Sequence, residues 1–177
     1  MGALVVVPAR MASTRFPGKP LVDLGGRPML RHVLDRIEEA DLGLPIRVAT
    51  PDAVIADACV SWGVAVTMTR DDHPSGTDRI AEALADEPFD FAINVQGDEP
   101  LLDPRSIRVL HDGMANSAAQ VGTLWIEAGA DEESDPAVVK LVTGDDGRAI
   151  YFSRHAIPFA RNARSEPLKR HLGLYAY

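Results

Sequence analysis

The chain has 177 residues, 46% hydrophobic and 25% charged, which is ordinary for one soluble globular domain. Its 26 acidic residues outnumber its 18 lysines and arginines, and the net charge of −8 argues against nucleic acid or an anionic membrane surface as a partner. No apolar run is long enough to span a bilayer, and we expect no signal peptide. The single cysteine, Cys59, excludes an intrachain disulfide and favours the cytoplasm; we interpret it as buried filler rather than a nucleophile.

Apolar runs and amphipathic segments alternate through the first 126 residues. In chain order they predict a strand at 3–7, a helix after the turn at 25–28, and a strand at 46–49. A helix opened by Thr50-Pro51 and closed by Gly63 follows, then a strand at 64–67, a helix at 77–85 and a strand at 91–95. The last two elements of this part are a helix opened by Asp103-Pro104 and a strand at 121–126. The first helix is supported by Leu30, Val33, Leu34 and Ile37, which recur at helical spacing. This alternation is typical of βαβ units, so we predict an α/β fold with a mixed, mostly parallel sheet layered between helices.

The pattern changes after about residue 130. Residues 138–142, the turn TGDDG and residues 149–153 predict an antiparallel hairpin extension. The closing residues, LGLYAY, alternate as in a strand and stop within it, so we expect a chain that is shortened at its C-terminus.

A cationic loop, PARMASTRFPGKP, follows the first predicted strand. It matches neither a Walker A loop nor the glycine turn of dinucleotide-binding folds. Its donors are Arg10, Arg15 and Lys19, together with the hydroxyls of Ser13 and Thr14. This set suits a polyphosphate, which offers many acceptor oxygens. The alternative is that these are solvated charges that pair with surface acids.

A carboxylate follows a second buried strand, in the segment QGDEP at 96–100. Ligands of open α/β sheets gather at the carboxyl ends of the strands, so we expect Asp98 to lie beside the cationic loop. Asp98 there could hold a Mg²⁺ that bridges phosphate oxygens, and Glu99 is a second candidate ligand. The alternative is a turn-forming aspartate beside Gly97. The five histidines show no metal-ligand spacing.

Five ordered blocks resemble one known family. They are VVVPARMASTRFPGKPLVDLGGRPML, MTRDDHPSGTDRIAEAL, INVQGDEPLL, AIYFSRHAIPF and RHLGLYAY, and together they cover nearly the whole chain. They are similar to the CMP-Kdo synthetases, the 3-deoxy-manno-octulosonate cytidylyltransferases. The pattern PAR-x-x-S-x-R-x-P-x-K within the first block is shared with the related CMP-sialate synthetases, whereas VQGDEP with the SGT and YFSR blocks points more narrowly to Kdo.

The resemblance implies a fold like that of the nucleotide-diphospho-sugar transferases and an enzyme that uses CTP to activate Kdo for lipopolysaccharide biosynthesis. It implies Mg²⁺ as cofactor and a homodimer, in a single domain over 1–177 with a CTP-binding part at about 1–130 and a sugar-acid-binding and dimerisation part at about 131–177. By position it implies CTP binding by Arg10, Ser13, Arg15, Lys19, Ser75, Gly76 and Thr77; sugar-acid binding by Arg79, Gln96, Arg154, Arg161, His171 and Tyr175; and catalysis by Arg15, Lys19 and Asp98, with Asp98 as the metal ligand.

The family pattern continues beyond the YAY strand with a helix and an acidic segment that supplies a second metal ligand. Two interpretations therefore stay open for this sequence. One is an active synthetase for Kdo or for a related 2-keto sugar acid such as sialic acid. The other is a shortened nucleotide-binding homologue with weak activity or none.

Overall fold

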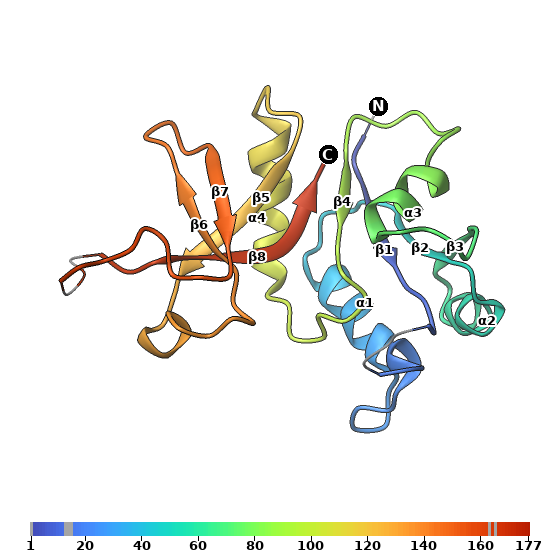
Figure 1. Cartoon of the computed structure of the whole chain (residues 1–177). Coiled ribbons are helices and arrows are strands. Elements are labelled where there is room, and N and C mark those ends of the chain that lie inside the picture. Colours follow the sequence, from blue (N-terminus) through green and yellow to red (C-terminus); the bar gives the residue numbers. More distant parts are fainter. Residues whose placement is uncertain (1, 13–15, 163, 165) are drawn as a thin grey trace. The chain divides into compact units, whose positions relative to one another are not determined.

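The computed structural model describes residues 2–12, 16–162, 164 and 166–177. The chain forms two compact units (Figure 1). Unit 1 comprises Met1–Gly122 and Leu174–Tyr177, and unit 2 comprises Thr123–Gly173. No helix among the described residues combines the length and the apolar character that a membrane crossing requires.

Four strands form the parallel part of the sheet in unit 1. They are β1 (Leu4–Pro8), β2 (Ile46–Thr50), β3 (Ala65–Met68) and β4 (Ala92–Asn94). Their spatial order is β3-β2-β1-β4, and each adjacent pair is parallel. The end of β8 (Lys169–Ala176) pairs antiparallel with β4. The order places β1 in the middle, which explains its continuous apolar run, because a central parallel strand is covered on both faces.

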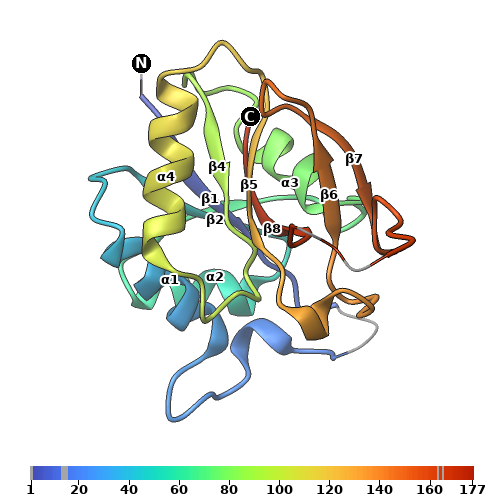
Figure 2. The same cartoon turned by 90° about the vertical axis from the view of Figure 1, so that its left-hand side faces the viewer.

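Helices cover both faces of this sheet. They are α1 (Met29–Glu39), α2 (Ala53–Ser61), α3 (Gly76–Ala83) and α4 (Pro104–Ala115), and a short 3-10 helix, η1 (Lys19–Leu21), precedes α1. Ile80 and Leu84 at α3 pack in one cluster with Leu4 and Val6 of β1. Figure 2 shows α1 and α4 on the opposite side of the strands from α3. The predicted layering of helices around a mixed sheet is confirmed.

The two predicted helix starts have different outcomes. Asp103 is the N-cap residue of α4, and its carboxylate accepts a hydrogen bond from the backbone N–H of Arg105 at 2.9 Å, as expected. The prediction that Thr50-Pro51 opens α2 is wrong, because α2 begins at Ala53. Thr50 is the last residue of β2, where it lies opposite Met68 of β3, so the sheet takes the residue that the sequence offers as a cap.

Unit 2 contains an antiparallel arrangement of β6 (Lys140–Thr143), β7 (Ala149–Ser153) and the first part of β8. It also contains β5 (Gly122–Glu127, whose first residue lies in unit 1) and a short 3-10 helix, η2 (Ala130–Glu132). The pairing of β6 with β7 confirms the predicted hairpin, and β6 also pairs antiparallel with β8. The ammonium of Lys140 is fully buried and donates hydrogen bonds to the carbonyls of Asp135, Val138 and Arg154, which compensates for its desolvation.

Candidate active site

Unit 1 has a cavity of about 310 Å³ that is formed by the segments following β1 and β4 and by the loop before α3. Seven of the predicted site residues line it: Arg10, Lys19, Ser75, Gly76, Arg79, Gln96 and Asp98. Because β1 and β4 are parallel neighbours, the segments that leave their carboxyl ends meet at the same edge of the sheet. The sequence-based expectation that Asp98 lies beside the cationic loop is therefore confirmed by position.

The cationic loop is held at both of its described ends through Met11. The N–H of Met11 donates to the carboxylate of Asp52 at 2.8 Å, and its carbonyl accepts from the N–H of Gly18 at 2.9 Å. Gly18 has a φ of 76°, a left-handed conformation that glycine adopts without strain, and it begins η1. Ser13 and Arg15, both predicted to bind CTP, lie outside the described residues.

Lys19 and Asp98 form an ion pair at the mouth of the cavity. Lys19 Nζ lies 2.6 Å from Asp98 Oδ2, with about a third and a half of the two side chains exposed. A pair so exposed adds little to stability because water screens it. Its chemical consequence matters more, since a ligand that enters the cavity can replace Asp98 as the partner of Lys19, or Lys19 as the partner of Asp98.

Gly97 allows the two strand ends to approach closely. A Cβ at this position would lie 3.0 Å from the carbonyl oxygen of Pro8, the last residue of β1. Gly76 makes a similar approach, since a Cβ there would lie 3.1 Å from Pro8 Cγ. Gly97 thus packs against the backbone of Pro8 and Gly76 against its ring, and a larger side chain at either glycine would disturb this packing.

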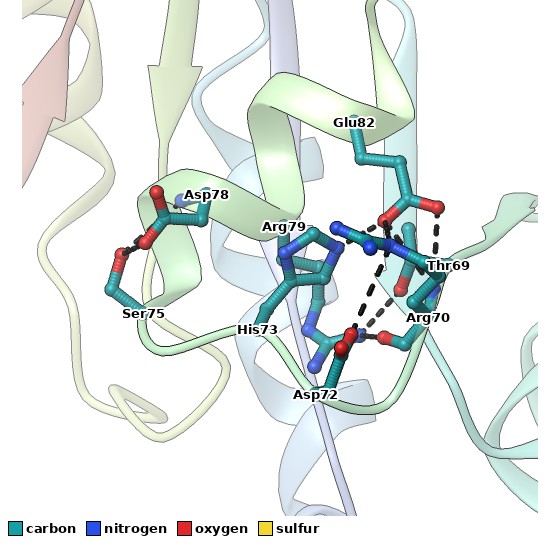
Figure 3. Close-up of polar contacts among 8 residues, drawn as sticks. All are labelled: Thr69, Arg70, Asp72, His73, Ser75, Asp78, Arg79 and Glu82. Carbon is teal, nitrogen blue, oxygen red and sulfur yellow. Dashed lines mark hydrogen bonds and ion pairs between the residues drawn. The ribbon is translucent and has the colours of Figure 1, made fainter.

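Arg79 of α3, whose polar contacts are drawn in Figure 3, is almost completely buried, with 2% of its surface exposed, yet it lines the cavity. Its Nη1 donates to Thr69 Oγ1 and, at 2.7 Å, to the carbonyl of Arg70. Burial lowers the pKa of this guanidinium from its usual range, and the positive charge of Arg10 lowers it further. Arg10 and Arg79 carry like charges, and an anion that binds between them reduces their mutual repulsion.

His73 lines the same cavity and is buried. Its Nε2 pairs with Oε2 of Glu82 on α3, and the Glu82 carboxylate also accepts from the N–H of Arg70 at 3.3 Å. The hydrogen bond from His73 is the main cause that lowers the pKa of Glu82 below its usual range. Figure 3 shows Glu82 in contact with both Arg70 and His73, which lie on the loop that precedes α3.

Ser75 begins α3 as its N-cap residue. Its hydroxyl oxygen accepts from the N–H of Asp78 at 3.2 Å, and the hydroxyl donates to the Asp78 carboxylate. The hydroxyl therefore has a structural role at the helix start. Its predicted contact with CTP stays a prediction.

A line of hydrogen bonds fixes Gln96. Its Nε2 donates to Asn94 Oδ1 at 2.9 Å, Asn94 Nδ2 donates to Tyr177 Oη at 3.2 Å, and Tyr177 also bonds the side chain of Thr77. Thr77 is exposed and does not line the cavity, and Tyr175 lies on β8 opposite Asn94. Burial raises the pKa of Tyr175.

The other predicted sugar-acid residues belong to unit 2, where they lie at separate places. Arg154 Nη1 donates to the carbonyl of Pro136 at 2.7 Å, and Arg161 lines a different cavity of the unit. His171 lies 2.9 Å from Thr123 Oγ1, and burial lowers its pKa. The roles predicted for these residues stay predictions.

The sequence reasoning missed four residues that shape this site: Asp52, His73, Glu82 and Gly97. His73 and Glu82 stand in the block that carries the SGT motif, but nothing in their spacing assigns them a role. Asp52 directly precedes α2, where an aspartate is expected to act as the N-cap residue of that helix. Its bond to Met11 joins residues 41 apart, which no local pattern reveals.

No group of three or more histidine, cysteine or acidic side chains comes together as a metal centre within 2–12, 16–162, 164 and 166–177. One exposed carboxylate, Asp98, does lie in the cavity. This set suits only a cation that takes one protein carboxylate and completes its shell with ligand phosphates and water, as Mg²⁺ does.

Comparison with known proteins decides the family. A sequence model of the family described as Cytidylyltransferase matches residues 4–177. The chain belongs to this family. The 3-deoxy-manno-octulosonate cytidylyltransferases of Rhodospirillum centenum, Escherichia coli and Photobacterium profundum are 45%, 42% and 46% identical to it over 98%, 99% and 100% of its length. The resemblance to the CMP-Kdo synthetases is thus confirmed, and the chain spans 70%, 72% and 75% of these cytidylyltransferases.

Solved structures agree on the fold. The structure of CMP:2-keto-3-deoxy-manno-octonic acid synthetase complexed with CTP has a TM-score of 0.94 and 42% identity, and the match covers all of this chain and 74% of that cytidylyltransferase. A cytidylyltransferase from Leptospira borgpetersenii has a TM-score of 0.62 and 24% identity over 70% of this chain and 53% of its own, which shows the fold alone.

Proposed function

We propose that this chain transfers the cytidylyl group of CTP to Kdo and releases pyrophosphate, which gives the CMP-Kdo used in lipopolysaccharide biosynthesis. The observation that carries the proposal is the unit 1 cavity, which is lined by the cations Arg10, Lys19 and buried Arg79 and by the carboxylate of Asp98. It is supported by the relatives named above and by the CTP-complexed structure with which the chain aligns throughout.

The triphosphate is the part of CTP that this cationic group fits. Arg10 presents an exposed guanidinium whose planar fork meets two phosphate oxygens at once. Burial is the main cause that lowers the pKa of Arg79, and an anion bound between Arg10 and Arg79 would relieve the repulsion by Arg10 that lowers it further. Lys19 adds a point charge, since the only partner that its ammonium has among the described residues is the exposed Asp98 carboxylate.

Asp98 is the residue that would hold Mg²⁺, with CTP oxygens completing the shell. The bound cation supplies neutralisation of phosphate charge in the transition state. Lys19, released from its ion pair, turns toward the phosphates and stabilises the same charge.

The reaction joins the C2 hydroxyl oxygen of Kdo to the α-phosphorus of CTP and breaks the bond from that phosphorus to the oxygen bridging the β-phosphate. The hydroxyl proton leaves to solvent, and the electrons of the broken bond stay on pyrophosphate. The chain contributes alignment and charge stabilisation, which together account for most of the catalysis in phosphoryl-type transfers. Gln96, held by Asn94, offers a fixed amide to the hydroxyls of the sugar acid.

The same proposal includes a cytoplasmic homodimer. Unit 2 exposes large apolar side chains, among them Tyr151 at 62% and Phe159 at 88%, which a partner subunit would cover. Arg154, Arg161, His171 and Tyr175 remain the sequence-based candidates for binding the sugar acid.

Pyrophosphate release tests the proposal directly. We expect CTP, Kdo and MgCl₂ together to give CMP-Kdo and pyrophosphate in a coupled assay, and the omission of any one to abolish it. Sialic acid in place of Kdo tests the related activity. Asp98→Asn should abolish turnover, whereas Asp112→Asn, an exposed carboxylate on α4, should not. Retention of CTP without product would contradict the proposal and favour a nucleotide-binding homologue.

A further inference from the structure

His73 contributes a single hydrogen-bonding atom to the cavity, and its chemistry is set by Glu82. A carboxylate can only accept hydrogen bonds, so the ring nitrogen that meets Glu82, Nε2, must carry the hydrogen. In the neutral ring the other nitrogen, Nδ1, is then an acceptor. The lowered pKa of Glu82, caused chiefly by this hydrogen bond, keeps the carboxylate ionised and the tautomer fixed.

Nδ1 is open to the cavity. The described residues make no hydrogen bond to it. Every fully buried side-chain nitrogen or oxygen among them has a partner, so Nδ1, which has none, is not sealed in the interior. His73 itself lines the cavity, and Figure 3 shows Nδ1 on the side of the ring away from Glu82. The free lone pair is therefore available to a ligand.

The neighbourhood of Nδ1 determines which part of a ligand it meets. An acceptor repels phosphate and carboxylate oxygens, which are acceptors too, so the anionic groups belong with the cations Arg10, Lys19 and Arg79. Pro8 and Ala9 contribute apolar lining to the same cavity, and Gly76 lies close against Pro8. An aromatic base that carries an N–H donor matches an apolar lining with one acceptor.

We propose that His73, held by Glu82, is a specificity-determining residue that accepts a hydrogen bond from the exocyclic amino group of cytosine and so selects CTP over UTP. The inference rests on the proposed function. Uracil presents a carbonyl oxygen at the same position, and two acceptors facing each other leave both unpaired, which a polar site penalises strongly. Glu82 acts as a positioning residue because it fixes the tautomer without touching the ligand.

The test is the ratio of CTP to UTP affinity, measured by calorimetry with each nucleotide and MgCl₂. A ratio does not depend on the fraction of a variant that is folded, so partial unfolding cannot imitate the result. We expect the wild-type chain to prefer CTP by about tenfold or more, and His73→Ala to lower CTP affinity about tenfold while UTP affinity stays within about twofold.

Two milder variants test the tautomer. In His73→Asn a side-chain amide near the Nδ1 position can either accept or donate, so CTP binding should survive while the preference over UTP disappears. Glu82→Gln can either accept from Nε2 or donate to it, so both tautomers become possible and the preference should likewise fall about tenfold. His111→Ala, a histidine of α4 outside the cavity, should leave both affinities unchanged.

The outcomes separate this inference from the proposed function. An unchanged CTP-to-UTP ratio in His73→Ala, or a rise in the KM for Kdo alone, would overturn the role of His73 while the cytidylyltransferase proposal stood. A wild-type chain that binds neither nucleotide would overturn both.

Discussion

Gly97 lies where the segment after β4 passes closest to the end of β1. In Gly97→Ala the new methyl group would lie 3.0 Å from the carbonyl oxygen of Pro8, 3.5 Å from Val7 Cγ1 and 3.6 Å from Ala9 Cβ. The nearest of these atoms belongs to backbone that cannot swing aside, so the two strand ends must separate by a few tenths of an ångström. The φ of Gly97 is not positive, so the backbone itself accepts alanine.

The expected energy follows from this overcrowding. Overpacking a tight site costs roughly 1–3 kcal/mol, and the reduced entropy of the unfolded alanine chain returns roughly 0.4–1 kcal/mol, so we expect a net destabilisation of about 1 kcal/mol. The larger effect is on function, because Asp98 moves relative to Arg10. Misplacement by about 1 Å can cost about a hundredfold in rate, so a shift of a few tenths should lower kcat about tenfold.

Urea unfolding followed by tryptophan fluorescence measures the first effect, and pyrophosphate release measures the second. Gly113→Ala is the matched control, since Gly113 lies within α4 with open space around a Cβ. It should stabilise the chain by roughly 0.5–1 kcal/mol and leave turnover unchanged. Wild-type stability and turnover in Gly97→Ala would refute the close-approach reasoning.

Three further predictions rest on other contacts. Asp52→Ala removes the acceptor for the N–H of Met11 and should cost about 1 kcal/mol in urea unfolding while weakening CTP binding, whereas Asp52→Asn keeps an acceptor oxygen; equal effects of the two would contradict the anchoring role. Burial raises the pKa of the Cys59 thiol from 9.0 to about 11, so the free energy of unfolding should fall as the pH rises from 9 toward 11. Iodoacetamide at pH 8 should label Cys59 only in denaturant, and labelling of the native chain would count against its burial. The hydrogen bond from His73 lowers the pKa of Glu82 below 4.5, so the stability it adds is present above pH 4.5 and is lost as the pH falls through the folded-state pKa; the urea midpoint of Glu82→Gln should therefore depend less on pH between 3 and 5, and an unchanged dependence would argue against the pair.

Local pattern was enough for most of the fold. Leu30, Val33 and Ile37 are all buried on α1, as their spacing predicted, because an amphipathic helix has one way to bury its apolar face. The hairpin of β6 and β7 was equally readable from its turn. Thr50 shows the limit: a residue suited to cap a helix was used in a strand ladder, and only the neighbouring strand decides between the two.

The charged residues of the site could be predicted from the sequence, whereas the long-range side-chain contacts that position its other residues could not. Lys19 and Asp98 could be placed together because each follows a parallel strand, although 79 residues separate them. The pairing of His73 with Glu82 depends on how a loop folds back over α3, which neither residue type nor spacing specifies.

The place where the nucleotide binds is the most informative property to measure. A crystal of this chain soaked with CTP and MgCl₂ measures it directly. We predict density for a triphosphate against Arg10 and Lys19, with the base beside His73. A nucleotide found elsewhere on the chain, or an empty cavity at saturating CTP, would contradict the account.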